Sequence, residues 1–429
     1  MPNLTKAPKL EKINFTKCKK LSDVHPSIKV LKQLQELRMS CTRIKQLRTE
    51  LMVFENLKTF DLSACGNLIK IPDLSGAPNL EKIDFSYCRN LGKFHSSIKV
   101  LKRLQELRMS NTQIKQLWKG LVVLPNLKEL DLNYCENLIE IPDLSGAPNL
   151  EKIDFSYCGS LCKVHPSIKV LKRLQKLKMC GTRIKQLWKG WVVLPNLKEL
   201  DLMCCENLIE MPDLSGAPNL EKIEFSYCES LCKFHSSIKG LKRLQELEMS
   251  GTQIKQPWKG LVVFDNLKEL DLSCCENLIE TPDLSGVPNL EKIDFSYCES
   301  LYKFHSSIKG LKRLQELRMS CTRIKQLWKG LAVLPNLKEL DLSFSENLIE
   351  IPDLSEAPNL EKIDFSYFRS LCKFHSSIKV LKRLQELRMS GTQMLNRPRI
   401  WVSQSRSQSK NRWFLPLSLL AIRRQLKNH

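Results

Sequence analysis

Residues 114–158 read IKQLWKGLVVLPNLKELDLNYCENLIEIPDLSGAPNLEKIDFSYC and contain one pattern twice, L-x-x-[LI]-x-[LF]-x-x-C, starting at Leu127 and at Leu150. In each copy two apolar residues stand two positions apart, which is typical of a short strand with one buried side. No two-residue turn separates the copies, so the chain returns by a wider loop and the two strands are expected to be parallel. The stretch therefore predicts two successive coils of a solenoid.

The pattern recurs throughout the chain in units of 70 residues. Near-copies of A-P-N-L-E-K-I-D-F-S-Y-C stand at Leu10, Leu80, Leu150, Leu220, Leu290 and Leu360. Each unit divides into coils of 24, 23 and 23 residues, and the last two coils open at Leu360 and Leu384. We predict an α/β leucine-rich-repeat solenoid, a horseshoe of about 17 coils with a parallel sheet on its concave side.

The repeats set the expected domain boundaries. We predict a solenoid over residues 1–393 and a separate basic tail over 394–429, which keeps no coil positions and contains no Asp or Glu. The tail is rich in Arg, Ser and Gln, and we expect it to be disordered or poorly packed. Neither end of the repeats shows the polar cap that solenoids use for solubility.

The segments that return between strands differ in the three coil types. In the first type, Ser96 or Ser97 is expected to cap a short helix that turns Ile98 inward. In the second type, a turn of helix is expected to end near Gly120, with Trp118 in the core. In the third type, I-P-D-L-S-G-A-P predicts an extended or single-turn return, because two prolines and a glycine disfavour helix.

Charge and composition exclude several classes of protein. The net charge is +22, but residues 1–70 hold 14 Lys and Arg against 6 Asp and Glu, and the tail holds 8 basic residues. The charge therefore lies at the ends, and we expect no nucleic-acid partner. The N-terminus lacks the apolar segment of a secretory signal, and the apolar run 413–422 is too short to span a membrane. Together with 17 cysteines, this predicts free thiols in a reducing compartment.

The blocks I-K-Q-L-W-K-G, P-N-L-K-E-L-D-L and I-P-D-L-S-G-A-P-N-L-E-K-I-D-F-S-Y-C resemble a known family. They are similar to the leucine-rich-repeat region of plant TIR-type nucleotide-binding disease-resistance proteins, over residues 1–393. The resemblance implies a cytoplasmic or nuclear module of the plant defence response. It also implies protein partners: a pathogen effector, a guarded host protein or the nucleotide-binding domain of a receptor.

The chain departs from that family in several ways. It contains no G-x-x-x-x-G-K-[ST] phosphate loop, so we expect no nucleotide cofactor, and we also expect no TIR domain before the repeats. The L-W-x-G block, usually single in the family, occurs four times, at Trp118, Trp188, Trp258 and Trp328. Two alternatives therefore stay open: an inactive fragment of a resistance gene, and an adaptor that presents substrates to a ubiquitin ligase.

The expected binding surface is the concave face, formed by the residues two, four, six and seven positions after each coil-opening Leu. Such a row of opposite charges can also be a solvated ladder of weak ion pairs, which is the alternative interpretation. The candidate protein-binding residues are Lys82, Asp84, Tyr87, Glu106, Arg108, Asn111, Asp131, Tyr134, Asp154, Tyr157, Lys176, Lys178, Asp201, Glu246, Glu248 and Arg318.

Variation between two units favours a contact role for this face. Residues 71–140 and 141–210 differ at 13 positions, and six of the differences fall in these slots, where about two are expected by chance. Convex lysines keep their identity, so exposure alone does not account for the excess. The six pairs are Glu106/Lys176, Arg108/Lys178, Ser110/Cys180, Asn111/Gly181, Asn133/Met203 and Tyr134/Cys204.

Cysteine and histidine form a second candidate set, C-x3-C-x2-H at Cys158, Cys162 and His165. The set lacks the fourth ligand of a closed zinc site, and Cys158 occupies an inward slot where such repeats satisfy backbone groups. The same residues lack an orienting carboxylate and a pocket, as nucleophilic catalysis requires. We therefore predict no metal, no cofactor and no enzymatic activity.

Overall fold

The computed structural model describes residues 1–47, 53–258, 260–328, 332–368 and 375–392. The predicted tail, residues 394–429, lies outside the described residues. Within the described part, 17 strands of three residues form one parallel sheet, and each strand pairs with the next one along the chain. The leucine-rich-repeat solenoid and its parallel sheet are thus confirmed.

Strands of the first coil type are β1 (Lys12–Asn14), β4 (Lys82–Asp84), β7 (Lys152–Asp154), β10 (Lys222–Glu224), β13 (Lys292–Asp294) and β16 (Lys362–Asp364). Those of the second type are β2 (Glu36–Arg38), β5 (Glu106–Arg108), β8 (Lys176–Lys178), β11 (Glu246–Glu248), β14 (Glu316–Arg318) and β17 (Glu386–Arg388). Those of the third type are β3 (Thr59–Asp61), β6 (Glu129–Asp131), β9 (Glu199–Asp201), β12 (Glu269–Asp271) and β15 (Glu339–Asp341).

The register of the sheet repeats the coil lengths read from the sequence. Lys82 faces Glu106, Glu106 faces Glu129 and Glu129 faces Lys152, at sequence separations of 24, 23 and 23 residues. Parallel pairing without offset places equivalent side chains of successive coils in straight rows. This is why a pattern of single residues becomes a continuous surface.

The core lies between the strands and the returning segments. Leu80, Ile83, Phe85, Cys88 and Leu91 of one coil are each 1 % exposed or less, and the same slots are buried in the neighbouring coils. Each coil thus buries its apolar side against the coils before and after it, which is how a solenoid gains stability without a globular core.

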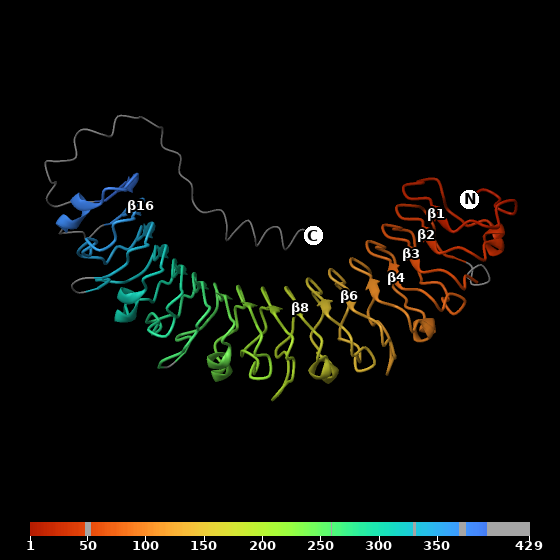
Figure 1. The fold of residues 1–429 in the computed structure, drawn as a ribbon, viewed down its shortest axis with the longest axis horizontal. Helices are drawn as coiled ribbons and strands as arrows, with labels where there is room; N and C mark the ends of the chain where they lie inside the picture. Colours follow the sequence, from red (N-terminus) through yellow and green to blue (C-terminus); the bar gives the residue numbers. More distant parts are fainter. Residues whose placement is uncertain (48–52, 259, 329–331, 369–374, 393–429) are drawn as a thin grey trace. The chain divides into compact units, whose positions relative to one another are not determined.

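In the described part of the chain, six short 3-10 helices occupy the return of the first coil type, on the side of the stack opposite the strands (Figure 1). They are η1 (Pro26–Val30), η3 (Ser96–Val100), η4 (Pro166–Val170), η5 (Ser236–Gly240), η6 (Ser306–Gly310) and η7 (Ser376–Val380).

The predicted serine cap of these helices is wrong in its detail. His95 is the N-cap of η3, because its ring Nδ1 accepts a hydrogen bond from the Ser97 amide at 3.2 Å. The Ser97 hydroxyl instead accepts from the amide of Leu74 in the preceding coil at 2.8 Å. The serine therefore ties two coils together, while the histidine starts the helix. Ile98 is buried, as predicted.

The other two returning segments contain no helix in their described residues. The expected turn of helix before Gly120 is wrong, although Gly120 does take the left-handed backbone, with φ at 68°. Trp118 is buried, as predicted, and its indole Nε1 donates to the carbonyl oxygen of Asp143 at 3.1 Å. The third return is extended with turns, as its prolines indicate.

Candidate functional site

The strand face carries three rows of side chains, named here by their distance from the coil-opening Leu. Row two runs from Lys12 to Glu386 and row four from Asn14 to Arg388, both within the strands. Row seven runs from Lys17 to Gly391, just after the strands, and all of its residues have a left-handed backbone. The three rows together make up the strand face.

All 16 predicted contact residues lie on these rows, and none of them is buried. Lys82, Tyr87, Tyr134 and Lys176 are exposed, and the other twelve are half-buried. Their placement agrees with the expected surface, while their role in binding stays a prediction. The assignment of position six to that surface is wrong for Ser86, Ser110 and Cys180, which are all buried, because the strand ends at position four and the backbone then turns inward.

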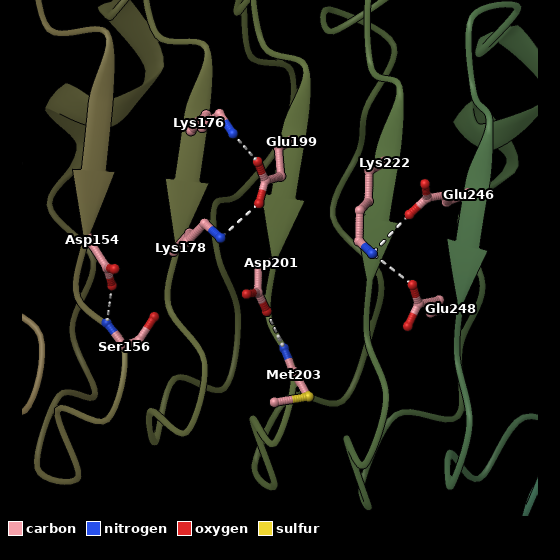
Figure 2. A network of polar contacts seen from close by, with 10 residues as sticks. All are labelled: Asp154, Ser156, Lys176, Lys178, Glu199, Asp201, Met203, Lys222, Glu246 and Glu248. Carbon is pink, nitrogen blue, oxygen red and sulfur yellow. Dashed lines mark hydrogen bonds and ion pairs between the residues drawn. The ribbon is translucent and has the colours of Figure 1, made fainter.

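Ion pairs connect rows two and four across neighbouring strands. Lys82 contacts Glu106 at 2.7 Å, as the sequence predicts for adjacent strands. Figure 2 shows a second group, in which Lys176 and Lys178 both contact Glu199, at 2.6 and 2.7 Å. These pairs are partly exposed, so each contributes little to stability.

Figure 2 also shows Lys222, which reaches Glu246 at 2.8 Å and Glu248 at 2.7 Å from the neighbouring strand. One ammonium group thus contacts two carboxylates. Partial burial lowers the pKa of Lys222, but the hydrogen bonds to Glu246 and Glu248 and the charges of these carboxylates together outweigh it, so the pKa lies above the ordinary value.

The aspartates of row four also shape the backbone that follows each strand. The carboxylate of Asp154 accepts from the Ser156 amide at 2.8 Å, and that of Asp201 accepts from the Met203 amide at 3.1 Å (Figure 2). Burial nevertheless raises the pKa of Asp201, as it does for Asp271 and Asp294. These carboxylates are therefore anchored by one oxygen and incompletely hydrated.

Aromatic residues recur along row seven in an unusual backbone conformation. Tyr87 has φ at 61° and is 55 % exposed, and bulky residues adopt this region rarely. The rings of Tyr134 and Tyr157 stack with centroids 4.7 Å apart, as do those of Phe344 and Tyr367 at 4.4 Å. Stacked aromatic rings that are exposed or half-buried, as these are, are common contact residues in protein interfaces.

The cysteines and histidines of the second candidate set have structural roles. The Cys158 thiol donates to the carbonyl oxygen of Leu132 at 3.2 Å, and burial raises its pKa well above the ordinary value. Cys162 is exposed, and the ring Nδ1 of His165 caps η4. No group of three potential metal ligands occurs among the described residues.

Buried cysteines occupy the inward slot in many coils of the solenoid. Burial raises the pKa of the Cys88 thiol to about 12 and that of Cys275 to about 11. Thr112 stands between two cysteine coils, where its hydroxyl donates to the carbonyl oxygen of Met109 at 3.0 Å. Cys and Thr thus satisfy buried backbone carbonyls in successive coils, as the sequence predicted for the inward slot.

Comparison with known proteins confirms the resemblance to plant disease-resistance proteins. The chain is 32 % identical over 276 residues to disease resistance protein RPP4 of Arabidopsis thaliana and 30 % identical over 264 residues to RPP5 of the same plant. The alignments cover 64 % and 60 % of this chain, but only 23 % and 18 % of those proteins. This chain therefore spans less than a quarter of the length of these relatives. No family model matches it.

Solved structures support the fold alone. YopM of Yersinia enterocolitica matches with a TM-score of 0.63 and 22 % identity, over 91 % of this chain and 80 % of that one. A leucine-rich-repeat protein of Leptospira interrogans matches with a TM-score of 0.55 and 21 % identity, over 91 % and 87 % of the two chains. Among the described residues, none of the helices has the length and apolar character that crossing a membrane requires.

Proposed function

We propose that this chain is a protein-recognition module of a plant defence response and that the strand face is its contact surface. Two findings support the proposal: the similarity to disease-resistance proteins and the leucine-rich-repeat solenoid, an architecture that offers extended binding surfaces. The module would sense a pathogen or host protein, or regulate a receptor, in the cytoplasm or nucleus. It would act by binding and without chemistry of its own.

Variation on the strand face is the observation that carries the proposal. Two neighbouring units are nearly identical, yet four of their differences lie on this face and a fifth, Asn133/Met203, lies at a partly exposed position six beside it. The sixth pair, Ser110/Cys180, is buried and does not count toward it. A surface that binds different partner proteins is expected to vary in its exposed residues while the buried residues of the coil stay constant. The five pairs are Glu106/Lys176, Arg108/Lys178, Asn111/Gly181, Asn133/Met203 and Tyr134/Cys204.

An exchange between these units tests the proposal with a matched control. The face variant places the residues of unit 141–210 at the equivalent positions of unit 71–140. Its substitutions are Glu106→Lys, Arg108→Lys, Asn111→Gly, Asn133→Met and Tyr134→Cys. The control variant carries four other natural differences of the same two units, as Arg89→Gly, Asn90→Ser, Gln113→Arg and Leu121→Trp. Both variants use residues that the next unit already accommodates, so both should fold.

The tagged chain is recovered from infected and healthy leaf extracts, and the proteins bound to it are quantified by mass spectrometry. Only the face variant is expected to change the set of bound proteins, and restriction of pathogen growth by the expressed chain should change with it. Identical sets for the wild type and both variants would refute the strand face as the contact surface.

A further inference from the structure

One unit differs from the others in the charge pattern of row four. The second coil of each unit places a cation in that row, except in residues 211–280, where Glu248 stands. The same unit has Glu224 where the other described first coils have Asp or, in β1, Asn. The cations of the other second coils are Arg38, Arg108, Lys178, Arg318 and Arg388.

The exchange at position 248 creates five consecutive strands, β9 to β13, with a carboxyl group in row four. We call them the acidic tract; with strands ~4.8 Å apart it is roughly 20 Å long. The register aligns the five side chains directly, strand by strand. They are Asp201, Glu224, Glu248, Asp271 and Asp294.

The cations of the other units show what the acidic tract lacks. Arg108 contacts Glu106 at 3.5 Å and Glu129 at 3.3 Å, and Arg318 contacts its two neighbouring glutamates at 3.3 Å. A row-four arginine in the second coil can thus neutralise carboxylates on two strands at once, whereas Lys178 reaches Glu199 alone. Glu248 cannot do this, and within the described residues it alone of the acidic tract has an ion pair, with Lys222.

The acidic tract is also partly withdrawn from water. Glu224 is only 7 % exposed, and its Oε1 accepts from the Ser226 amide at 2.8 Å. Row seven borders the acidic tract with Tyr227, which is half-buried, and Tyr297, which is 40 % exposed. A tyrosine ring beside a carboxylate row is suited to a guanidinium or ammonium group, which is attracted by the ring and by the carboxylates.

We propose that the acidic tract binds an extended, cationic peptide segment of a partner protein, whose Arg or Lys side chain takes the place that Arg or Lys occupies in the equivalent coils of the other units. The proposal rests on the strand face being the contact surface and names the chemistry of the segment that it receives. The chain as a whole has a net charge of +22, which repels a cationic peptide. Binding would therefore depend on the local field of the acidic tract rather than on the overall charge.

Proton release gives the interaction a distinctive pH dependence. Burial, and then the hydrogen bond with Glu248, raise the pKa of Glu224 to about 8. The charged groups around it are Glu199 and Asp201 on β9, Lys222 on its own strand, and Glu246 and Glu248 on β11. A bound cation favours the ionised carboxylate, so the affinity should rise between about pH 6 and about pH 8.

The test uses the full chain and a fluorescein-labelled peptide of about eight residues in which arginine alternates with serine, so that alternate side chains face the same way. Its ends are acetylated and amidated, and a peptide with glutamate in place of arginine serves as the charge control. Binding is measured by fluorescence anisotropy at constant ionic strength. Glu248→Arg restores the residue type of the other units and is expected to fold and to weaken binding of the arginine peptide by roughly tenfold.

Glu136→Arg is the matched control, because it makes the same change in charge at an exposed position away from the strand face. Its effect on binding should stay below about twofold. The proposal is overturned if the wild type does not bind the arginine peptide, or if both variants weaken binding equally. Either result would leave the strand face as the contact surface for another partner, provided that the five-residue exchange still changes the proteins bound from leaf extract.

Discussion

Replacement of Glu224 by Gln tests the electrostatics of the strand face most directly. The carboxyl group is buried between β9 and β11, and its pKa of about 8 lies well above the ordinary value of 4.5. A carboxyl group with a raised pKa in the folded state binds more protons there than in the unfolded chain. Its favourable contribution is therefore complete below the unfolded pKa and is lost as the pH rises toward about 8.

The size of the effect follows from that difference in pKa. Each unit corresponds to about 1.4 kcal/mol, so raising the pH from about 5 to about 8 costs the wild type at most about 4 kcal/mol. The hydrogen bond from Glu224 lowers the pKa of Glu248, so Glu248 is ionised in the folded and the unfolded chain alike over this range and leaves the cost unchanged. Relaxation of the coils and entry of water on ionisation reduce the cost, and we expect a net effect of about 2 kcal/mol.

Glutamine keeps the shape of the protonated acid and can donate to Glu248, but it does not ionise. Glu224→Gln should therefore match the wild type in urea denaturation near pH 5 and exceed it by about 2 kcal/mol near pH 8. Glu136→Gln, which removes a charge at an exposed position, measures the general effect of charge. An equal stability difference between Glu224→Gln and the wild type at both pH values would refute the inferred burial of this carboxyl group.

Three further predictions concern the coil itself. Trp118→Ala should destabilise the chain by about 3–5 kcal/mol in urea denaturation, and Trp118→Phe by clearly less, because the indole is buried and donates to the Asp143 carbonyl oxygen; equal losses would contradict the packing. Gly216→Ala should lower the melting temperature, because its Cβ would meet the Val192 carbonyl oxygen, whereas Gly240→Ala has open space and should not. Iodoacetamide should modify the exposed Cys18, Cys162 and Cys232 of the native chain first, and the buried Cys88 only after denaturation, as peptide mapping would show; early labelling of Cys88 would mean that the coils open.

The sequence alone determines the repeating coil, because the coil depends on periodic burial. Leu127, Leu130, Leu132 and Cys135 are all fully buried, as their spacing predicts. The spacing of the coil openings fixes the parallel register without further information, since every strand pairs with its neighbour in the chain. The same periodicity places the 16 predicted contact residues on the strand face.

Only the tertiary structure decides how each polar side chain is used, because that depends on atoms contributed by the adjacent coil. In the structure His95 caps the helix, and the Ser97 hydroxyl accepts a hydrogen bond from the amide of Leu74, 23 residues earlier. The tertiary structure also buries Ser110 at position six, which looks exposed by strand alternation, because the strand ends before that residue. The raised pKa of Glu224 likewise follows from its neighbours on β9 and β11, which no local pattern in the sequence reveals.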